Sequence, residues 1–120
     1  MDYFKAKNLA QSGRKGTNTK RLENNTYAID RTNEVGIRLH RTDVVRFFQD
    51  GSIVLNSGGW NTVTTKDRMN RYSPFRIQSV KGLWSVWHDG RFLGLFKDGM
   101  RIAKVNNYWT VTKQNEANAS

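Results

Sequence analysis

Short apolar runs separated by polar turns dominate the chain from residue 25 onward. Val35, Ile37 and Leu39 fall on one face of an extended segment, and Arg38 and His40 fall on the other. Comparable runs recur at residues 26–29, 44–48, 52–55, 83–87, 91–96, 100–105 and 108–112. The pattern predicts about seven or eight short strands, and it has no alternation of strands with helices that would indicate a parallel sheet.

Three Asp-Gly steps interrupt these runs, at Asp50-Gly51, Asp89-Gly90 and Asp98-Gly99. Glycine readily adopts the positive φ of a tight turn, so each step predicts a hairpin. The last two steps are nine residues apart, which predicts a three-stranded meander over residues 83–105. An Asn106-Asn107 turn then leads into a final strand.

One segment has a helical signature, from about residue 65 to residue 72. Thr64 is followed three residues later by Asp67, as in a capping box, and Pro74 ends the helix. On the helical wheel Met69 and Tyr72 share one side, which predicts that they dock on the sheet.

Arg68 and Arg71 lie beside that docking side, so we expect both arginines to face solvent. The sequence therefore predicts a mainly β fold, a small antiparallel sheet or partly closed barrel with one short helix. Three regions are expected: a flexible basic arm over residues 1–22, a single β-rich domain over residues 23–112, and a tail over residues 113–120.

Charge adds an expected partner to this fold. The chain has 20 Lys and Arg against 10 Asp and Glu, a formal charge of +10. Such an excess points to an acidic partner, with nucleic acid the first expectation and an acidic protein surface the second. No apolar run approaches the roughly 20 residues of a membrane-spanning helix, so we expect no membrane partner.

The residue types present restrict the chemistry. The chain has no cysteine, which excludes disulfides, thiolate metal sites and a cysteine nucleophile. Its two histidines, His40 and His88, have no metal-binding spacing, and no phosphate-binding glycine loop is present. We therefore expect no metal and no cofactor.

Cations and aromatic residues concentrate in two regions that suit nucleic acid. The N-terminal arm offers Arg14, Lys15, Lys20 and Arg21 as phosphate contacts. The second region follows Gly58-Gly59 and contributes the remaining candidates, Trp60, Lys66, Arg68, Arg71, Tyr72 and Arg76. Trp60 has two interpretations, since its ring either packs on the core or stacks on a base.

A catalytic interpretation rests on His40, Thr42 and Asp43. With His88 and nearby cations, these residues suggest a metal-free ribonuclease in which His40 is the general base. No spacing in the sequence enforces that arrangement. A strand-face position for His40 and a turn or strand-end hydrogen-bonding role for Asp43 explain the same residues. We expect a non-enzyme with no catalytic residues.

The stretch LHRTDVVRFFQDGSIVLNSGGWNTVTTKDRMNRY, residues 39–72, resembles a recurrent stretch in small uncharacterised proteins of tailed bacteriophages. The resembling positions follow the pattern LHxTDVV, DG, LNSGGW, TTK and RMN. The resemblance implies a viral origin and action in the cytoplasm of the infected bacterial host. It carries over no activity and no functional residue.

These observations lead to one expected function and two alternatives. The expected function is nucleic-acid binding of low sequence specificity, with phosphates held by the basic arm and the helix. The first alternative is an inhibitor that binds an acidic surface of a host defence or nucleic-acid-processing protein. The second alternative is the metal-free ribonuclease. The sequence leaves the preferred nucleic acid and the oligomeric state open.

Overall fold

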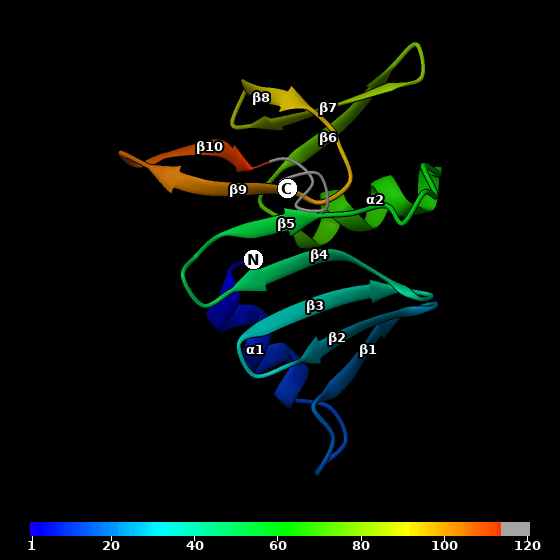
Figure 1. Cartoon of the computed structure of the whole chain (residues 1–120). Coiled ribbons are helices and arrows are strands. Elements are labelled where there is room, and N and C mark those ends of the chain that lie inside the picture. Colours follow the sequence, from blue (N-terminus) through cyan, green and yellow to red (C-terminus); the bar gives the residue numbers. More distant parts are fainter. Residues whose placement is uncertain (114–120) are drawn as a thin grey trace, which may run out of the picture.

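The fold is built on one seven-stranded sheet in which all neighbouring strands are antiparallel (Figure 1). The computed structural model describes residues 1–113. In spatial order the strands are β1 (Thr19–Glu23), β2 (Thr26–Asp30), β3 (Glu34–Leu39), β4 (Thr42–Phe48), β5 (Ile53–Leu55), β9 (Met100–Val105) and β10 (Tyr108–Lys113). The mainly β, antiparallel prediction is confirmed. The sheet does not close into a barrel, because β1 and β10 remain separate edges.

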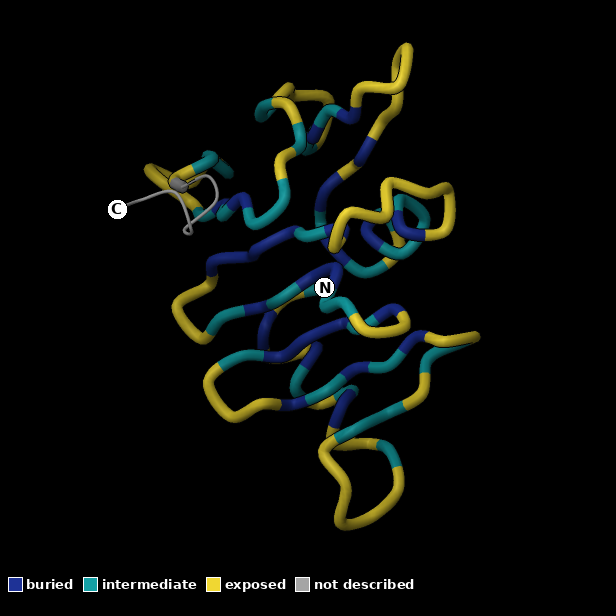
Figure 2. The backbone as a smooth tube through the Cα atoms, turned by 45° about the vertical axis from the view of Figure 1, so that its right-hand side comes forward, coloured by how far each residue is buried: buried dark blue, intermediate teal, exposed yellow. Residues whose placement is uncertain are grey.

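One face of this sheet forms the hydrophobic core. Two rows of paired residues run across the strands, Ala28–Ile37–Val45–Leu55–Met100 and Val35–Phe47–Ile53–Ile102–Val111. Burial follows these rows, as the dark segments of Figure 2 show, while the hairpin tips are exposed. The predicted inward face of Val35, Ile37 and Leu39 is confirmed, since all three are buried.

The N-terminal region contains a helix that the sequence analysis missed. Helix α1 (Tyr3–Gln11) begins at Asp2, whose side chain accepts a hydrogen bond from the Lys5 N–H. Tyr3, Ala6 and Ala10 are buried against the sheet. The predictions of a flexible arm over residues 1–22 and of a single helix are therefore wrong. Two alanines allow the helix to approach β2 closely, and small side chains give little hydrophobic signal.

A buried carboxylate fastens α1 to the sheet. Asp30, at the end of β2, accepts hydrogen bonds from Lys7 and Gln11 of α1 and from the Thr32 N–H. The Lys7 Nζ lies 2.9 Å from Asp30 Oδ2. Burial acts to raise the pKa of Asp30, but the three hydrogen bonds outweigh it and hold the pKa below its usual value.

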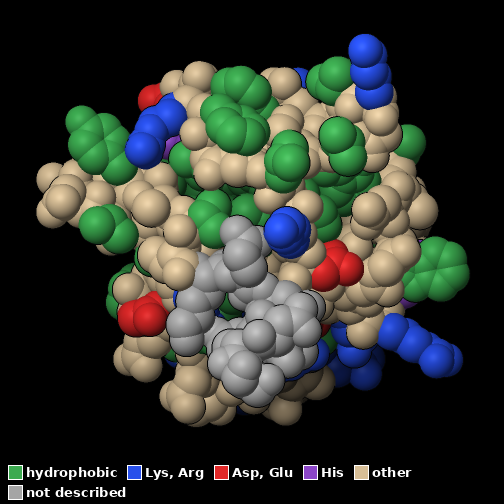
Figure 3. All heavy atoms as spheres, turned by 45° about the horizontal axis from the view of Figure 1, so that its top comes forward, with side chains coloured by type: hydrophobic (Ala, Val, Ile, Leu, Met, Phe, Trp, Pro, Cys, Tyr) green, Lys and Arg blue, Asp and Glu red, His purple; other side chains and the backbone are tan. Residues whose placement is uncertain are grey.

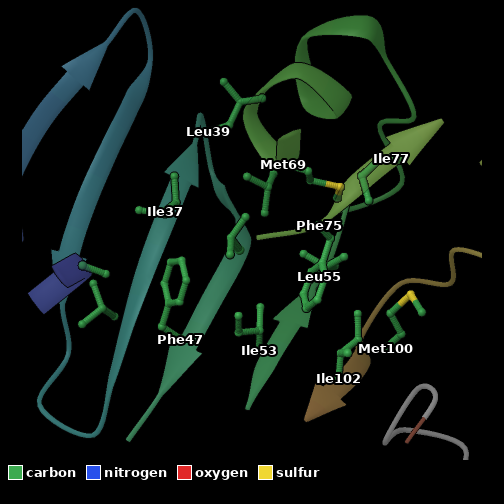
Figure 4. Close-up of a cluster of buried hydrophobic side chains, with 14 of the residues drawn as sticks. Ile37, Leu39, Phe47, Ile53, Leu55, Met69, Phe75, Ile77, Met100 and Ile102 are labelled. Atoms are coloured by element: carbon green, nitrogen blue, oxygen red, sulfur yellow. The ribbon is translucent and has the colours of Figure 1, made fainter. Parts of the chain in front are cut away.

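The predicted helix is present as α2 (Val63–Tyr72), two residues longer at its start than expected. Its N-cap is Thr62, whose hydroxyl accepts a hydrogen bond from the Thr65 N–H at 3.1 Å, so Thr64 is not the cap. Met69 is fully buried against the sheet and Tyr72 packs at the edge of the core, which confirms the predicted docking side. Figure 4 shows Met69 among the core side chains of β5 and β6.

A second sheet of three strands closes one end of the core. It comprises β6 (Arg76–Val80), β7 (Leu83–His88) and β8 (Arg91–Leu95). Phe75, just before β6, and Ile77 are buried in the shared core (Figure 4). The second sheet thus covers apolar surface that α1 and α2 leave open.

The expected meander over residues 83–105 is only partly present. Strands β7 and β8 form a hairpin at Asp89-Gly90, but β9 leaves that sheet and pairs with β5 and β10. The Asp98-Gly99 step is a crossover between sheets, and the Gly99 N–H donates to the Leu55 carbonyl oxygen at 2.9 Å. The Asp50-Gly51 hairpin and the Asn106-Asn107 turn are where the sequence places them.

The C-terminal aromatic residues divide between core and surface. Trp84 is buried, and Phe96 and Trp109 pack at the edge of the core. Phe92 is 51% exposed, and the half-buried Trp87 packs edge-on against it. The expected tail over residues 113–120 lies outside the described residues, except for the end of β10.

Candidate nucleic-acid interface

In the structure, the Arg68 side chain is largely buried rather than exposed to solvent. Its side chain is 12% exposed, its Nε donates to the Thr26 hydroxyl at 2.8 Å, and its guanidinium pairs with Glu23 and Asp67. The expected exposure of Arg68 is therefore wrong. Arg68 joins α2 to the β1–β2 hairpin, because Glu23 lies on β1 and Thr26 lies on β2.

Arg71 and Tyr72 converge on the same carboxylate. Arg71 is more exposed and pairs with Glu23 and Asp67, and the Tyr72 hydroxyl donates to Glu23. Desolvation, then the hydrogen bond to Glu23, raises the pKa of Tyr72 to about 12. The two α2 arginines face two carboxylates, so this cluster has little charge left to attract a phosphate.

The other predicted cations are spread over several surfaces. Arg14 and Lys15 are exposed in the loop between α1 and β1, and Arg76 is exposed on β6. On β1, Lys20 and Arg21 point to opposite faces of the sheet. Lys66 is half-buried on α2. The ten predicted site residues therefore do not form one surface.

A basic surface that the sequence analysis did not assemble lies on the face of the large sheet opposite the core. Two further rows of paired residues run across it, Arg21–Tyr27–Arg38–Asp43 and Gly36–Arg46–Val54–Arg101. Within residues 1–113, both helices pack on the core side, so no helix covers this side. We call it the open face and define it by Arg21, Tyr27, Arg38, Arg46, Phe48 and Arg101.

Guanidinium groups and aromatic rings are stacked on the open face. The Arg38 Cζ lies 5.2 Å from the Tyr27 ring centre. The Phe48 ring has Arg46 at 5.1 Å and Arg101 at 4.4 Å. A stacked guanidinium keeps its N–H edge free for phosphate oxygens, and its outer plane can support a base.

The cations of the open face differ in how far they are neutralised. Arg46 makes a bidentate pair with Glu34, its Nη2 lying 2.7 Å from Glu34 Oε2. Arg38 and Arg101 form no ion pair with any described carboxylate within 4.0 Å. Each therefore keeps its full charge at the surface.

The surroundings of Arg38 affect how it can bind an anion. Asp43 is the partner of Arg38 across the strands, but its carboxylate pairs with Arg31 at 3.3 Å. Burial raises the pKa of Asp43 above its usual value, although the nearby arginines partly oppose that effect. The Arg38 Nε is buried and has no hydrogen-bond partner among the described residues, which is uncommon for a residue kept only for stability.

The sequence held part of the information needed to find the open face. The alternation in residues 35–40 places Arg38 on the polar side of its strand, and the same reasoning applies to Arg46 between Val45 and Phe47. The strand register was missing, and only the register brings Arg38 beside Tyr27. The crossover that brings Arg101 to β5 has no local sequence signal.

The Gly-Gly-Trp loop is a rigid structure that presents Trp60 to solvent. Trp60 is 70% exposed, which favours the stacking interpretation over core packing. Ser57 anchors the loop from below, through two hydrogen bonds to Asp98, and its carbonyl oxygen accepts from the Trp60 N–H at 3.1 Å. Gly58 packs so closely on Thr42 that a Cβ atom there would lie 2.3 Å from the Thr42 Oγ1.

A cavity of about 600 Å³ opens between this loop, the start of α2 and the β3–β4 turn. Its floor is buried and its rim is exposed. The lining residues are Leu39, His40, Arg41, Thr42, Val44, Ser57, Trp60, Thr62, Thr64 and Thr65. All ten come from two parts of the stretch over residues 39–72, residues 39–44 and residues 57–65, so the fold brings these two parts together.

The two histidines are far from forming a catalytic pair. His40 is in the β3–β4 turn with φ of 57°, so it is not the strand-face residue that the pattern suggested. It lines the large cavity, whereas His88 lines a different one and stacks near Phe75 and Trp109. The non-enzyme expectation stays a prediction.

Two further properties concern metals and membranes. Among the described residues, no group of three or more His, Asp or Glu side chains is arranged to hold a metal ion. Neither helix in residues 1–113 is long and apolar enough to cross a bilayer.

Comparison with protein families gives one match. The family described as Kyanoviridae Gp96 protein matches residues 5–103. That span includes the open face up to Arg101, the Gly-Gly-Trp loop and the whole second sheet. Comparison with curated proteins gives no match. Comparison with solved structures gives none either.

Proposed function

Because the chain belongs to the Kyanoviridae Gp96 protein family and is thus a tailed-phage protein, we propose that it binds single-stranded nucleic acid with low sequence specificity through the open face. The site of action is the cytoplasm of the infected bacterial host. The family description names no activity, so the proposal rests on the surface chemistry of this chain.

The observation that carries the proposal is the pair Arg38 and Arg101. Within residues 1–113, both arginines are free of carboxylate partners, both stack on an aromatic ring, and both lie on a sheet face without a covering helix. Phosphates and unstacked bases are the groups that such a surface accommodates. A duplex presents its bases already stacked, so a single strand uses this surface better.

The experiment compares two double variants with matched loss of charge. Arg38→Gln/Arg101→Gln removes the two open-face arginines that stack on aromatic rings without an ion pair, and Lys5→Gln/Lys97→Gln removes two exposed cations elsewhere. Fluorescence anisotropy with labelled single-stranded DNA and RNA measures affinity for the wild type and both variants. The open-face variant loses at least tenfold in affinity, whereas the control loses much less.

Salt dependence provides the second readout. About four to six phosphate contacts give a log-log salt slope of roughly −3 to −4 for a single strand. The open-face variant reduces that slope by about 1 to 2, because two contacts are lost. Equal affinity and equal slope for the two double variants would refute the proposal.

A rival function has its own structural support at the other end of the molecule. Leu83, Phe92, Leu95 and Tyr108 are each more than half exposed on β7, β8 and β10. Figure 3 shows hydrophobic side chains gathered on this end. Exposed Lys81, Arg91, Lys97 and Lys104 lie near this patch in the sequence, on β8, β9 and the connections around β7 and β8. An apolar patch with a cationic rim suits an acidic protein surface, as an inhibitor of a host protein requires.

A pull-down separates the rival from the proposal. Tagged protein is mixed with nuclease-treated host lysate, with Leu83→Ser/Phe92→Ser as the control bait. A stoichiometric partner captured by the wild type and lost with that bait favours the inhibitor. Retained nucleic-acid affinity in the same variant would keep the open-face proposal intact.

A further inference from the structure

The cavity beside Trp60 lies on the core side of the sheet, away from the open face, and the proposed function makes no use of it. Its volume of about 600 Å³ is within the range of small-molecule sites. Leu39, Val44, Ser57 and Thr65 form a buried floor. The exposed rim carries a different set of groups, an indole, an imidazole, a guanidinium and hydroxyls.

The Trp60 indole has a solvent-exposed surface that is open to a ligand. Trp60 has no aromatic or cation contact among the described residues. Its loop is fixed from two sides, by the Ser57–Asp98 hydrogen bonds and by the contact of Gly58 with Thr42. An exposed aromatic ring on a backbone that is already fixed binds a planar ring without the entropy loss of ordering a loop.

The cation on the rim is Arg41, which has a fixed backbone turn and an unpaired guanidinium among the described residues. Arg41 is exposed and has no ion pair or side-chain hydrogen bond with the described residues. Its turn is held by the His40 N–H, which donates to the Asn25 carbonyl oxygen at 2.9 Å. His40 has a left-handed φ of 57°, a conformation that tertiary contacts must maintain. A guanidinium in this setting is suited to a phosphate.

Hydroxyl groups complete the lining. The Thr62 and Thr65 hydroxyls lie 3.1 Å apart and are paired with each other. The hydroxyls of Thr42 and Thr64 have no hydrogen-bond partner among the described residues, so they are available to a sugar or to a base edge. Among the residues that the structure describes, no carboxylate lines the cavity, so an anionic ligand meets no repulsion from these walls.

We infer that this cavity binds one nucleotide unit, with the base stacked on Trp60 and the phosphate held by Arg41. The chemistry is shared by a free nucleoside monophosphate and by the phosphorylated end of a strand. The inference goes beyond the open-face proposal and does not depend on it, because the two sites use different residues on opposite sides of the sheet.

Two-dimensional ¹H–¹⁵N NMR of the tryptophan side chains tests the inference directly. The chain has four tryptophans, and the Trp60→Phe spectrum identifies the Trp60 indole N–H signal. Titration with AMP, GMP, CMP and UMP shifts this signal saturably at up to millimolar concentration and leaves the Trp84 and Trp87 signals in place. Adenosine, which lacks the phosphate, binds at least tenfold more weakly than AMP.

Variants at the rim identify the phosphate contact. Arg41→Gln weakens nucleotide binding at least tenfold, while Arg76→Gln, an exposed arginine outside the cavity, leaves it unchanged. Oligonucleotides with a 5′-phosphate, a 3′-phosphate or neither are then titrated into the Arg38→Gln/Arg101→Gln variant. This background lacks Arg38 and Arg101, the two arginines that carry the open-face proposal, so a failure of one proposal does not imitate a failure of the other.

Each result decides the inference. A Trp60 shift with free monophosphates identifies a free-nucleotide site, and a shift only with phosphorylated oligonucleotides identifies a strand-end site; both support it. The absence of a saturable Trp60 shift with every probe overturns it. Equal binding of AMP and adenosine that is unaffected by Arg41→Gln also overturns it, because the phosphate would then have no role.

Discussion

Asp98 accepts two hydrogen bonds from Ser57, one from the backbone N–H at 2.8 Å and one from the hydroxyl at 2.7 Å. Ser57 is 1% exposed, and 41 positions separate the two residues. The pair joins the loop before α2 to the crossover before β9. The place of Trp60 on the surface therefore depends on a carboxylate that precedes a strand far along the chain.

Removing this carboxylate has a stability cost that depends on the replacement. Asp98→Ala leaves two buried donors of Ser57 unpaired and lowers the free energy of unfolding by about 1–3 kcal/mol. Asp98→Asn loses less, because its amide oxygen still accepts. Urea unfolding of the wild type and the two variants measures the difference. Equal losses in the two variants would show that the carbonyl-type acceptor does not matter.

Adjacent glycines in the Trp60 loop have different requirements. Gly58 and Gly59 have φ of 64° and 86°, so alanine at either position has a backbone cost of about 1–2 kcal/mol. At Gly58 the new Cβ would also meet the Thr42 Oγ1 at 2.3 Å, whereas nothing lies within 4 Å at Gly59. Gly58→Ala is therefore the more destabilising variant in thermal unfolding.

A second substitution tests the reason for that difference. Thr42→Ala removes Oγ1 and Cγ2, the two atoms nearest to the Gly58 Cβ position, so the double variant Gly58→Ala/Thr42→Ala recovers stability relative to Gly58→Ala alone. No recovery would place the cost in the backbone rather than in the contact. Combination of Gly59→Ala with Thr42→Ala is the control and shows no recovery.

The attachment of α1 depends on the charge of Asp30. Asp30→Asn removes the ion pair with Lys7 and lowers the free energy of unfolding by about 1–2 kcal/mol at neutral pH. The pKa of Asp30 is lowered by folding, so its contribution is complete above the unfolded value of about 3.9 and is lost as pH falls through the lower folded value.

The pH dependence of unfolding tests this assignment. The stability difference between the wild type and Asp30→Asn stays constant above about pH 5 and shrinks below about pH 4. Urea unfolding across that range measures the difference. A gap that persisted unchanged at the lowest pH would mean that shape, rather than charge, holds α1 in place.

Arg68 has a structural role according to its contacts, in contrast to its expected role in nucleic-acid binding. Arg68→Ala removes partners from Glu23, Asp67 and Thr26 and lowers the free energy of unfolding by about 1–3 kcal/mol. Its affinity for single-stranded DNA, measured by anisotropy on folded protein, equals that of Arg76→Ala, which loses the same charge. A selective affinity loss in Arg68→Ala would instead place the strand on α2.

Local patterns predicted eight of the ten described strands, because the signals of those strands are local, and missed β1 and β6. The alternation over Val35, Ile37 and Leu39 and the Asp50-Gly51 turn need only neighbouring residues to be interpreted. The docking side of α2 followed from the spacing of Met69 and Tyr72 in the same way. Helix α1 lacked such a signal, since its buried side chains are two alanines and one tyrosine among polar residues.

The surface chemistry depended on long-range partners that the sequence does not reveal. The helical pattern predicted an exposed Arg68, because its partner Glu23 lies on β1 and gives no signal within the helix itself. Asp98 looked like one more hairpin residue, although it anchors Ser57. Arg38 and Arg101 belong to one face only through the order of the strands. The sequence pattern therefore indicates which face of a strand a side chain occupies, but it does not indicate which distant residue that side chain contacts.

The crossover from β8 to β9 also sets the order in which the large sheet is completed. Strand β5 pairs with β4 on one side and must wait for β9 on the other, while α2 and the whole second sheet form the intervening loop. Closing so long a loop is a late and slow step in folding. On a ribosome, β1–β5 emerge first and leave β5 as an open edge. With three residues, β5 is the shortest described strand, so the waiting edge offers little backbone for pairing with another chain.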